Sequence, residues 1–269
     1  MLTSSPLRFA LFALLLAGIA YLAMDDARPQ IALPELVIIP PGDIAYRPMG
    51  NFTKDGKAAV PHAYVVHVDS FEIMKYQVSR DQYASCVSDG GCAAVPTGTG
   101  VLPQTQVNWI DATAYARWLS ARSGQNWQLP TAPQWQRAAA ERAGDVFSEL
   151  DADEDVLDPG ARMLAQYKTG TLLRGTHSSI LRPPGDFGVN SFGVADLAGN
   201  VWEWTDACLA NGIIHTDGSI ALGADYCGVR IAGGAHQAAV INFVRDASVG
   251  GCAVGLPPDH LGFRLVRSR

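Results

Sequence analysis

The chain has 269 residues, of which 48 % are hydrophobic and 17 % are charged, and its net charge is −6. This composition is typical of a globular protein and too apolar for a disordered one. The length suits one large domain or two small ones with a sizeable core. The acidic balance disfavours nucleic acid as a partner, because no basic surface is available to neutralise phosphates.

The N-terminal charge and hydropathy pattern predicts an export signal. Arg8 precedes an uncharged apolar run at residues 9–24, and Asp25 and Asp26 follow it. A positive flank, a short apolar core and an acidic far side predict a segment whose N-terminus stays inside. The run is shorter than the about 20 residues of a full span, and Gly18-Ile19-Ala20 offers a cleavage site. A cleaved signal peptide and an uncleaved membrane anchor both remain open.

These features predict an extracytoplasmic, periplasmic protein, exported or anchored to the inner membrane by residues 9–24. A buried core helix is the alternative, but the run has a charged flank and no amphipathic period. We divide the chain into the signal or anchor at 1–24, a polar tether at 25–34, and one globular domain at 35–269.

Strands are expected where apolar runs are short and bounded by turn residues. Residues 36–40 end in a Pro-Pro-Gly turn, and residues 64–68 alternate weakly, so each predicts a strand. Residues 145–158 turn acidic and lose periodicity, which predicts an exposed insertion. From Asn190 onward short apolar runs alternate with glycines, which predicts small strands and tight loops.

Three helices are expected from their start signals. Ser79 and Thr131 each precede a glutamine by three positions, which forms a capping box, and Asp111 can cap a helix between them. Gly124 and Gly144 stand where the second and third helices would end.

Export changes the expected state of the five cysteines, because thiols outside the cytoplasm tend to pair. Cys86 and Cys92 flank an Asp-Gly-Gly turn, and Cys208 and Cys227 bracket a Gly-rich loop. We expect these near neighbours to form two disulfides, although the sequence alone leaves the connectivity open. Cys252 is then left over, and a buried small apolar residue is its plain interpretation.

Several stretches resemble one family when they are taken together. They are FEIMKYQVSRDQY (71–83), LPTAPQWQRAAA (129–140), NSFGVADLAGNVWEW (190–204), RIAGG (230–234) and LGFRLVR (261–267). In this order they resemble the formylglycine-generating-enzyme, or sulfatase-modifying-factor, family over residues 34–267. The resemblance implies an α+β fold: the formylglycine-generating-enzyme variant of the C-type-lectin-like fold, which is low in regular secondary structure.

The resemblance also implies a calcium site. In the family a calcium is held by side-chain and backbone oxygens around the GNVWEW segment, and the matching positions here are Asp196, Gly199, Val201 and Glu203. Two carboxylates with carbonyls from a Gly-containing turn are ligands that calcium prefers. The alternative is that Glu203 pairs with an arginine and that the neighbouring tryptophans pack in the core.

The resemblance breaks at the oxidase chemistry. Formylglycine-generating enzymes oxidise a substrate cysteine with oxygen through copper(I) on two cysteines after the RGGS motif, and soft thiolates suit copper(I). Those two positions are Ala238 and Phe243 here, and Ala235 and His236 follow the glycine pair. We therefore expect no copper there. We expect no iron either, because the three-histidine helical domain of the iron-dependent relatives is absent.

His236, Cys252 and His260 are the remaining candidates for catalysis. They belong to segments that line the cleft in the family, and two histidines with a cysteine could bind copper. The plainer alternative is that a histidine beside a Gly-Gly turn is a surface or hydrogen-bonded residue. Arg245 and Arg264 match arginines of the family pattern and are expected to tie strands together.

Three functions stay open. The first is an exported accessory or maturation factor that binds a periplasmic protein, peptide or small molecule without generating formylglycine. The second is an oxidoreductase of the same superfamily with altered chemistry, as in pyoverdine maturation. The third, a formylglycine-generating oxidase, is disfavoured by Ala238 and Phe243. Convergent polar groups with perturbed pKa values near His236 would favour an enzyme, and an apolar cleft would favour binding.

Overall fold

The computed structural model describes residues 31–144, 180–244, 253–254 and 257–267. The chain divides into two compact units, Met1–Leu33 and Pro34–Arg269. The expected export segment, most of the tether and the expected insertion at 145–158 lie outside the described residues. Within the described ranges, no helix is long and apolar enough to cross a membrane.

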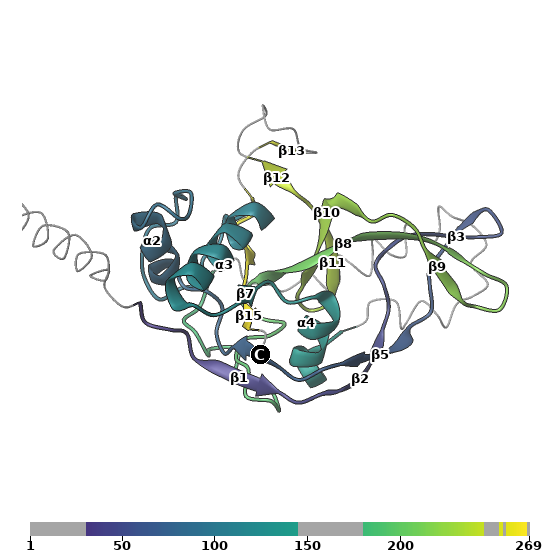
Figure 1. The fold of residues 1–269 in the computed structure, drawn as a ribbon, viewed down its shortest axis with the longest axis horizontal. Helices are drawn as coiled ribbons and strands as arrows, with labels where there is room; N and C mark the ends of the chain where they lie inside the picture. Colours follow the sequence, from purple (N-terminus) through teal and green to yellow (C-terminus); the bar gives the residue numbers. More distant parts are fainter. Residues whose placement is uncertain (1–30, 145–179, 245–252, 255–256, 268–269) are drawn as a thin grey trace, which may run out of the picture. The chain divides into compact units, whose positions relative to one another are not determined.

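The first sheet joins the two ends of the second unit (Figure 1). Its described strands run in the order β1, β6, β15 and β7, and all of their pairings are antiparallel. Their bounds are Leu36–Ile39, Phe71–Met74, Val266–Arg267 and Trp127–Gln128. The strand expected at 36–40 is confirmed as β1. C-terminal β15 lies between two strands from the first half of the chain, so the sheet forms only when both ends meet.

The second sheet is built on β8, Trp202–Ile214. Its described strands run in the order β11, β10, β8, β3 and β4, and β9 and β14 also pair with β8 (Figure 1). The other bounds are Gln237–Ile241, Tyr226–Gly233, Gly50–Lys54, Lys57–Ala59, Ile220–Leu222 and Leu261–Gly262. The expectation of only small strands after Asn190 is wrong, because β8 has 13 residues. Its alanines, asparagine and glycine have weak strand propensity, and pairing on both sides outweighs it.

Two further strand pairs complete the description. β2, Gly42–Tyr46, pairs antiparallel with β5, Tyr64–Val68, which confirms the second expected strand. β12, Phe243–Val244, pairs parallel with β13, Ala253–Val254.

The helices begin at capping boxes. α2, Arg80–Ser88, and α4, Ala132–Ala139, start at the expected caps Ser79 and Thr131. α3, Trp109–Ser123, starts at Asn108, so the cap expected at Asp111 is wrong. Asp111 instead closes the box from its third position, because its carboxylate accepts the Asn108 N–H at 2.8 Å. Gly124 ends α3 in the left-handed conformation, as expected.

The end of α4 differs from the expectation at Gly144. The helix stops at Ala139, Ala140 has a φ of 50°, and a single 3-10 turn, η1 (Ala140–Arg142), follows. Asn190 Nδ2 donates to the carbonyls of Ala138 and Ala139 at 2.6 and 3.2 Å. A distant side chain therefore satisfies the terminal carbonyls, and the helix needs no glycine cap.

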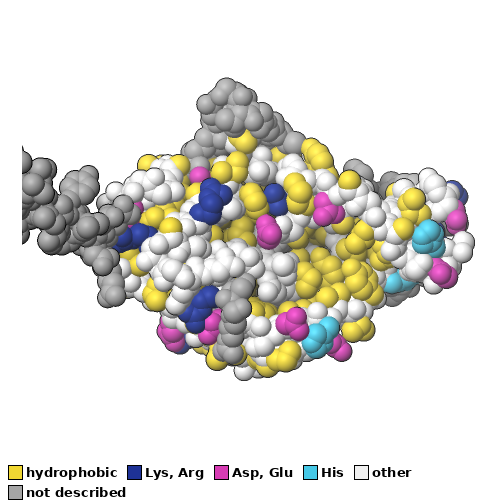
Figure 2. Space-filling model, in the orientation of Figure 1, with side chains coloured by type: hydrophobic (Ala, Val, Ile, Leu, Met, Phe, Trp, Pro, Cys, Tyr) yellow, Lys and Arg dark blue, Asp and Glu magenta, His cyan; other side chains and the backbone are white. Residues whose placement is uncertain are grey.

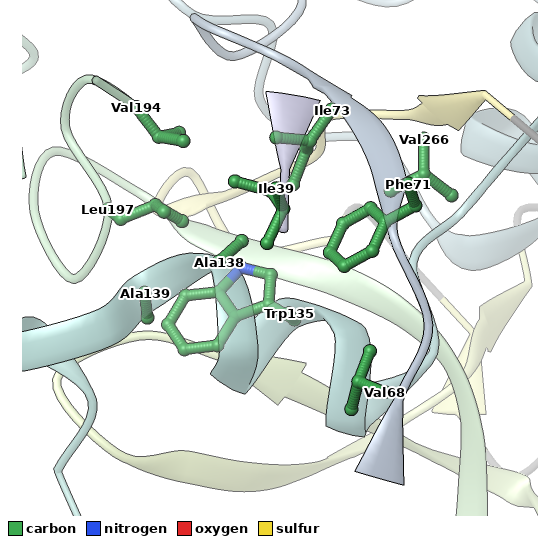
Figure 3. Packing of buried hydrophobic residues seen from close by; sticks show 10 residues of the cluster. All are labelled: Ile39, Val68, Phe71, Ile73, Trp135, Ala138, Ala139, Val194, Leu197 and Val266. Carbon is green, nitrogen blue, oxygen red and sulfur yellow. The ribbon is translucent and has the colours of Figure 1, made fainter. Parts of the chain in front are cut away.

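Helix α4 contributes to the main hydrophobic core (Figure 3). Trp135, Ala138 and Ala139 lie in one buried cluster with residues of the strands and of the loop before β8. Those partners are Ile39, Val68, Phe71, Ile73, Val194, Leu197 and Val266. Fully burying one valine, leucine, isoleucine or phenylalanine side chain stabilises a fold by about 1.5–3 kcal/mol. The core thus fixes the loop at 190–201 against the first sheet.

Both expected disulfides are present. Cys86–Cys92 links the last turn of α2 to the loop after it. Cys208–Cys227 links β8 to β10 in the second sheet. The near-neighbour pairing is confirmed, and Cys252 lies outside the described residues.

Candidate functional site

A buried ion pair joins Glu203 of the GNVWEW segment to Arg264. Arg264 Nε donates to Glu203 Oε2 and Arg264 Nη2 donates to Glu203 Oε1, each at 2.7 Å. The side chains of Arg264 and Glu203 are 0 % and 1 % exposed. Two further donors fill the remaining acceptor sites of the Glu203 carboxylate. Trp135 Nε1 donates to Oε2 at 2.9 Å, and Gln77 Nε2 donates to Oε1 at 2.8 Å. A buried pair of this kind is tolerated only when its remaining hydrogen-bonding capacity is also satisfied.

The same arginine ties three segments together. Its Nη1 donates to the carbonyls of Met74 and Lys75 at 3.1 and 2.9 Å, and its Nη2 donates to Ala195 O at 2.9 Å. The expectation that Arg264 ties strands together is confirmed. The expected alternative for Glu203, a pair with an arginine, is what the structure has.

The Asp196 carboxylate accepts hydrogen bonds from the backbone of the preceding loop. Asp196 is fully buried, and its two oxygens accept the backbone N–H groups of Gly185 at 2.6 Å and Phe187 at 2.9 Å. Its backbone carbonyl and that of Gly199 point to Gln77 Nε2, at 3.3 and 3.4 Å.

The four residues expected to bind calcium are close together, but their arrangement does not fit the ion. Asp196 O, Gly199 O and Glu203 Oε1 converge, and the amide nitrogen of Gln77 lies among them. Each carboxylate oxygen of Glu203 already accepts two protein donors, which fills its acceptor capacity, and each Asp196 oxygen accepts one backbone N–H. In the described ranges no cluster of three or more His, Cys, Asp and Glu side chains could hold a metal.

The β10–β11 hairpin carries the positions expected for copper. Ala238 on β11 pairs with Ala232 on β10, and neither side chain can ligate a metal. Phe243 begins β12, opposite Ala253 on β13. Cys252 and Arg245 fall in the undescribed stretch between these two strands.

The turn of this hairpin lies on two tryptophan rings. A Cβ atom on Gly233 would fall 2.3 Å from the Trp135 ring, and one on Gly234 would fall 2.6 Å from the Trp202 ring. Only glycine lets the backbone approach both rings this closely. The ring of His236 meets Trp202 edge-on, with the ring centroids 4.8 Å apart.

Both candidate histidines contact Trp202, one through its ring and the other through its backbone. His236 contacts the ring of Trp202, whereas His260 accepts the Trp202 N–H at 2.8 Å through its backbone carbonyl. The side chain of His260 is 61 % exposed and its Nδ1 lies 3.6 Å from Asp259 Oδ1.

A second set of groups borders Ala238. Arg230 pairs with Val240 and Ala232 pairs with Ala238, so Arg230 and Ala238 lie on one face of the β10–β11 hairpin. The Arg230 guanidinium stacks 3.6 Å from the Trp109 ring centroid. Its Nη1 donates to Asp206 O at 3.1 Å. Within the part of the chain that the structure describes, the buried Nε of Arg230 has no hydrogen-bond partner.

This set has perturbed pKa values. Asp206 has a side chain that is 61 % exposed; its partial burial raises the pKa of the carboxyl, and the nearby Arg230 cation lowers it in part. Burial also lowers the pKa of Arg230, against the opposing effect of Asp206. No local motif joins Trp109 to Arg230, so sequence reasoning missed this pair.

Together these features define an α+β domain in which a buried Glu–Arg pair connects segments that are far apart in the sequence. The chain matches the sulfatase-modifying factor enzyme 1-like domain over residues 23–269, and it belongs to this family. The expected family and fold class are confirmed.

The curated relatives match part of their length. A formylglycine-generating enzyme of Mycobacterium tuberculosis is 36 % identical over 107 residues, which are 38 % of this chain and 32 % of that protein. An inactive C-alpha-formylglycine-generating enzyme 2 of Mus musculus is 30 % identical over 171 residues, 62 % of this chain and 49 % of that protein. The chain thus spans about a third to a half of the length of these relatives.

A solved structure, Treponema denticola variable protein 1, superposes with a TM-score of 0.50 at 15 % identity. The match covers 87 % of this chain and 95 % of that one, and it shows the fold alone.

Proposed function

We propose that this chain is an exported accessory or maturation factor of its family, which binds a periplasmic protein, peptide or small molecule and does not generate formylglycine. The observation that carries the proposal is Ala238 on β11, opposite Ala232. At this position the family resemblance calls for a copper-binding cysteine. A methyl group offers neither a thiolate ligand nor a nucleophile.

The surface around the hairpin turn supports a binding role. Trp202 and His236, both half-buried, pack edge to face beside the buried Gly233–Gly234 pair, close in the chain to Ala238. Figure 2 shows hydrophobic side chains gathered on one face between β8 and the β2–β5 pair, with charged side chains scattered around them. Apolar surfaces with few polar groups are typical of binding sites for proteins and small molecules. The mouse relative, whose name describes it as inactive, also supports a role without formylglycine-generating activity.

The proposal includes export by residues 9–24. Its support is the flanking charge pattern, with Arg8 before the run and Asp25 after it. The two disulfides add to it, because they persist in an oxidising compartment such as the periplasm.

A second candidate is an oxidoreductase with altered chemistry, similar to the pyoverdine-maturation branch. The observation that favours it is Asp206, whose carboxyl pKa is raised by partial burial and whose Oδ1 lies 4.0 Å from Nη1 of Arg230, an arginine on the Ala238 face. A carboxyl of raised pKa can exchange a proton with a bound molecule nearer neutral pH.

A photo-crosslinking experiment tests the binding role. The amino acid benzoylphenylalanine replaces Ala238 in the full-length exported chain, and a matched variant carries it at Val101, which is 62 % exposed in the segment between α2 and α3. We expect one defined crosslinked partner from position 238 and not from position 101. That partner, once purified, is expected to bind the wild-type chain and not a Gly234→Trp variant. Equal crosslinking from both positions would contradict the proposal.

A further inference from the structure

We propose that the side-chain amide of Gln77 takes the place of a cation in this domain, so that the oxygen cluster around it stabilises the fold without calcium. The inference concerns the fold's own chemistry and does not depend on the proposed function.

The geometry of the amide is the first support. Gln77 Nε2 donates to Glu203 Oε1 at 2.8 Å and lies 3.3 and 3.4 Å from the carbonyl oxygens of Asp196 and Gly199. Gln77 is 4 % exposed, so water does not compete for these contacts. Three acceptors around one atom fix which end of the amide faces them, because an oxygen there would be repelled by all three. The NH2 group therefore provides the positive end that this cluster requires.

The charges around the cluster are the second support. The Glu203 carboxylate is neutralised by the Arg264 guanidinium at 2.7 Å. The Asp196 carboxylate is held by two backbone N–H groups. A divalent cation at the amide position would lie near the Arg264 cation in a buried place, beside a carboxylate that this arginine already neutralises. Burying unpaired charge is far more costly than burying a hydrogen-bonded neutral amide.

The third support is what one substitution would change. Calcium takes roughly six to eight oxygen ligands and favours carboxylates mixed with carbonyls. Gln77→Glu puts a second carboxylate oxygen among Asp196 O, Gly199 O and Glu203 Oε1. Without a cation, these four oxygens would repel one another. With calcium bound among them, they would act as its ligands. The residue at position 77 thus determines whether a protein amide or a bound cation offsets the negative charge of this oxygen cluster.

Thermal unfolding of the full-length chain tests this inference, with calcium chloride and a calcium chelator as the two conditions. We expect the wild-type midpoint to be the same in both. We expect the Gln77→Glu midpoint to fall in chelator and to rise by several degrees in calcium, because a ligand of the folded state stabilises it by mass action. The matched control is Gln128→Glu, which makes the same charge change at an exposed position on β7. It is expected to show no calcium response.

A second variant covers the case in which Gln77→Glu does not fold. Gln77→Met keeps the length of the side chain and removes the donor, so its midpoint should fall equally in chelator and in calcium. A wild-type midpoint that rises with calcium would overturn the inference. So would a folded Gln77→Glu chain that calcium fails to stabilise, or a Gln77→Met chain as stable as the wild type.

Discussion

Arg264, between β14 and β15, lies against Glu203 of β8 through two parallel hydrogen bonds of 2.7 Å, with both side chains almost fully buried. The two residues are 61 positions apart. The contact joins the C-terminal segment to the centre of the second sheet. The GNVWEW and GFR motifs are therefore two halves of one structural contact.

Arg264→Met should strongly destabilise the fold. The variant leaves the Glu203 carboxylate buried without its cation, and removing one partner of such a pair typically costs about 3–5 kcal/mol. Urea unfolding followed by tryptophan fluorescence measures the loss. Lys75→Ala is the control, because its pair with Glu35 is on the surface and is expected to contribute little. Equal effects of the two substitutions would show that burial of the pair is unimportant.

The two disulfides should differ in their contribution. Cys208–Cys227 closes a loop with a sequence separation of 19, and Cys86–Cys92 one of 6. In the chain-entropy model the longer loop is stabilised by about 3 kcal/mol and the shorter one by less. We expect the Cys208→Ser, Cys227→Ser variant to lose more urea stability than the Cys86→Ser, Cys92→Ser variant. The reverse order would mean that the buried environment of Cys86 outweighs loop closure.

The pKa of the Asp206 carboxyl should lie above the ordinary value of an aspartate. Burial raises its pKa from 3.8 and Arg230 partly opposes the rise. Since the folded state holds this proton to higher pH than the unfolded state, the contribution of Asp206 to stability is largest in acid. That contribution is lost as the pH rises from 3.8 through the folded pKa.

Carbon-detected NMR of the carboxyl measures this titration directly. Arg230→Met removes the nearby cation, so the Asp206 midpoint should move further up. Arg182→Met, which is far from Asp206 in the chain and pairs with Asp186, is the control and should leave the midpoint unchanged. A midpoint that falls in Arg230→Met would contradict the assigned roles.

Gly234→Ala should disturb the surface proposed for binding. The added methyl would lie 2.6 Å from the Trp202 ring, so the turn or the ring must move. Overpacking of this kind costs about 1–3 kcal/mol. Gly223→Ala is the matched control, because its methyl would meet only an ordinary contact at 3.6 Å from Asn211 O. We expect loss of partner binding and a changed Trp202 environment in the first variant alone, measured by binding and by NMR of the indole groups.

Local signals predicted the elements that depend on neighbouring residues. The capping boxes at Ser79 and Thr131 and the short disulfide loops need only a few positions of sequence, so they were readable. The cap of α3 was misplaced because Asn108 and Asp111 form one reciprocal box, and either residue alone resembles a cap.

Contacts between distant segments were not readable in the same way. The stacking of Arg230 on Trp109 and the contacts of Gln77 with the loop at 196–203 depend on the path of the chain. Three of the four residues that the resemblance implies for calcium surround Gln77 Nε2, through Asp196 O, Gly199 O and Glu203 Oε1. The resemblance could not show that Gln77, at a variable position of the KYxV motif, already fills their centre.

The central claim is that Ala238 and Phe243 deprive this domain of formylglycine-generating chemistry. The direct measurement is mass spectrometry of a cysteine-containing peptide incubated with the wild-type chain, copper(I), oxygen and a thiol reductant. In parallel, the Ala238→Cys, Phe243→Cys variant is made in a Cys252→Ser background and tested for copper(I) binding. The account predicts an unchanged peptide with the wild-type chain and one equivalent of copper(I) on the variant. Conversion of the peptide cysteine to an aldehyde by the wild-type chain would contradict it.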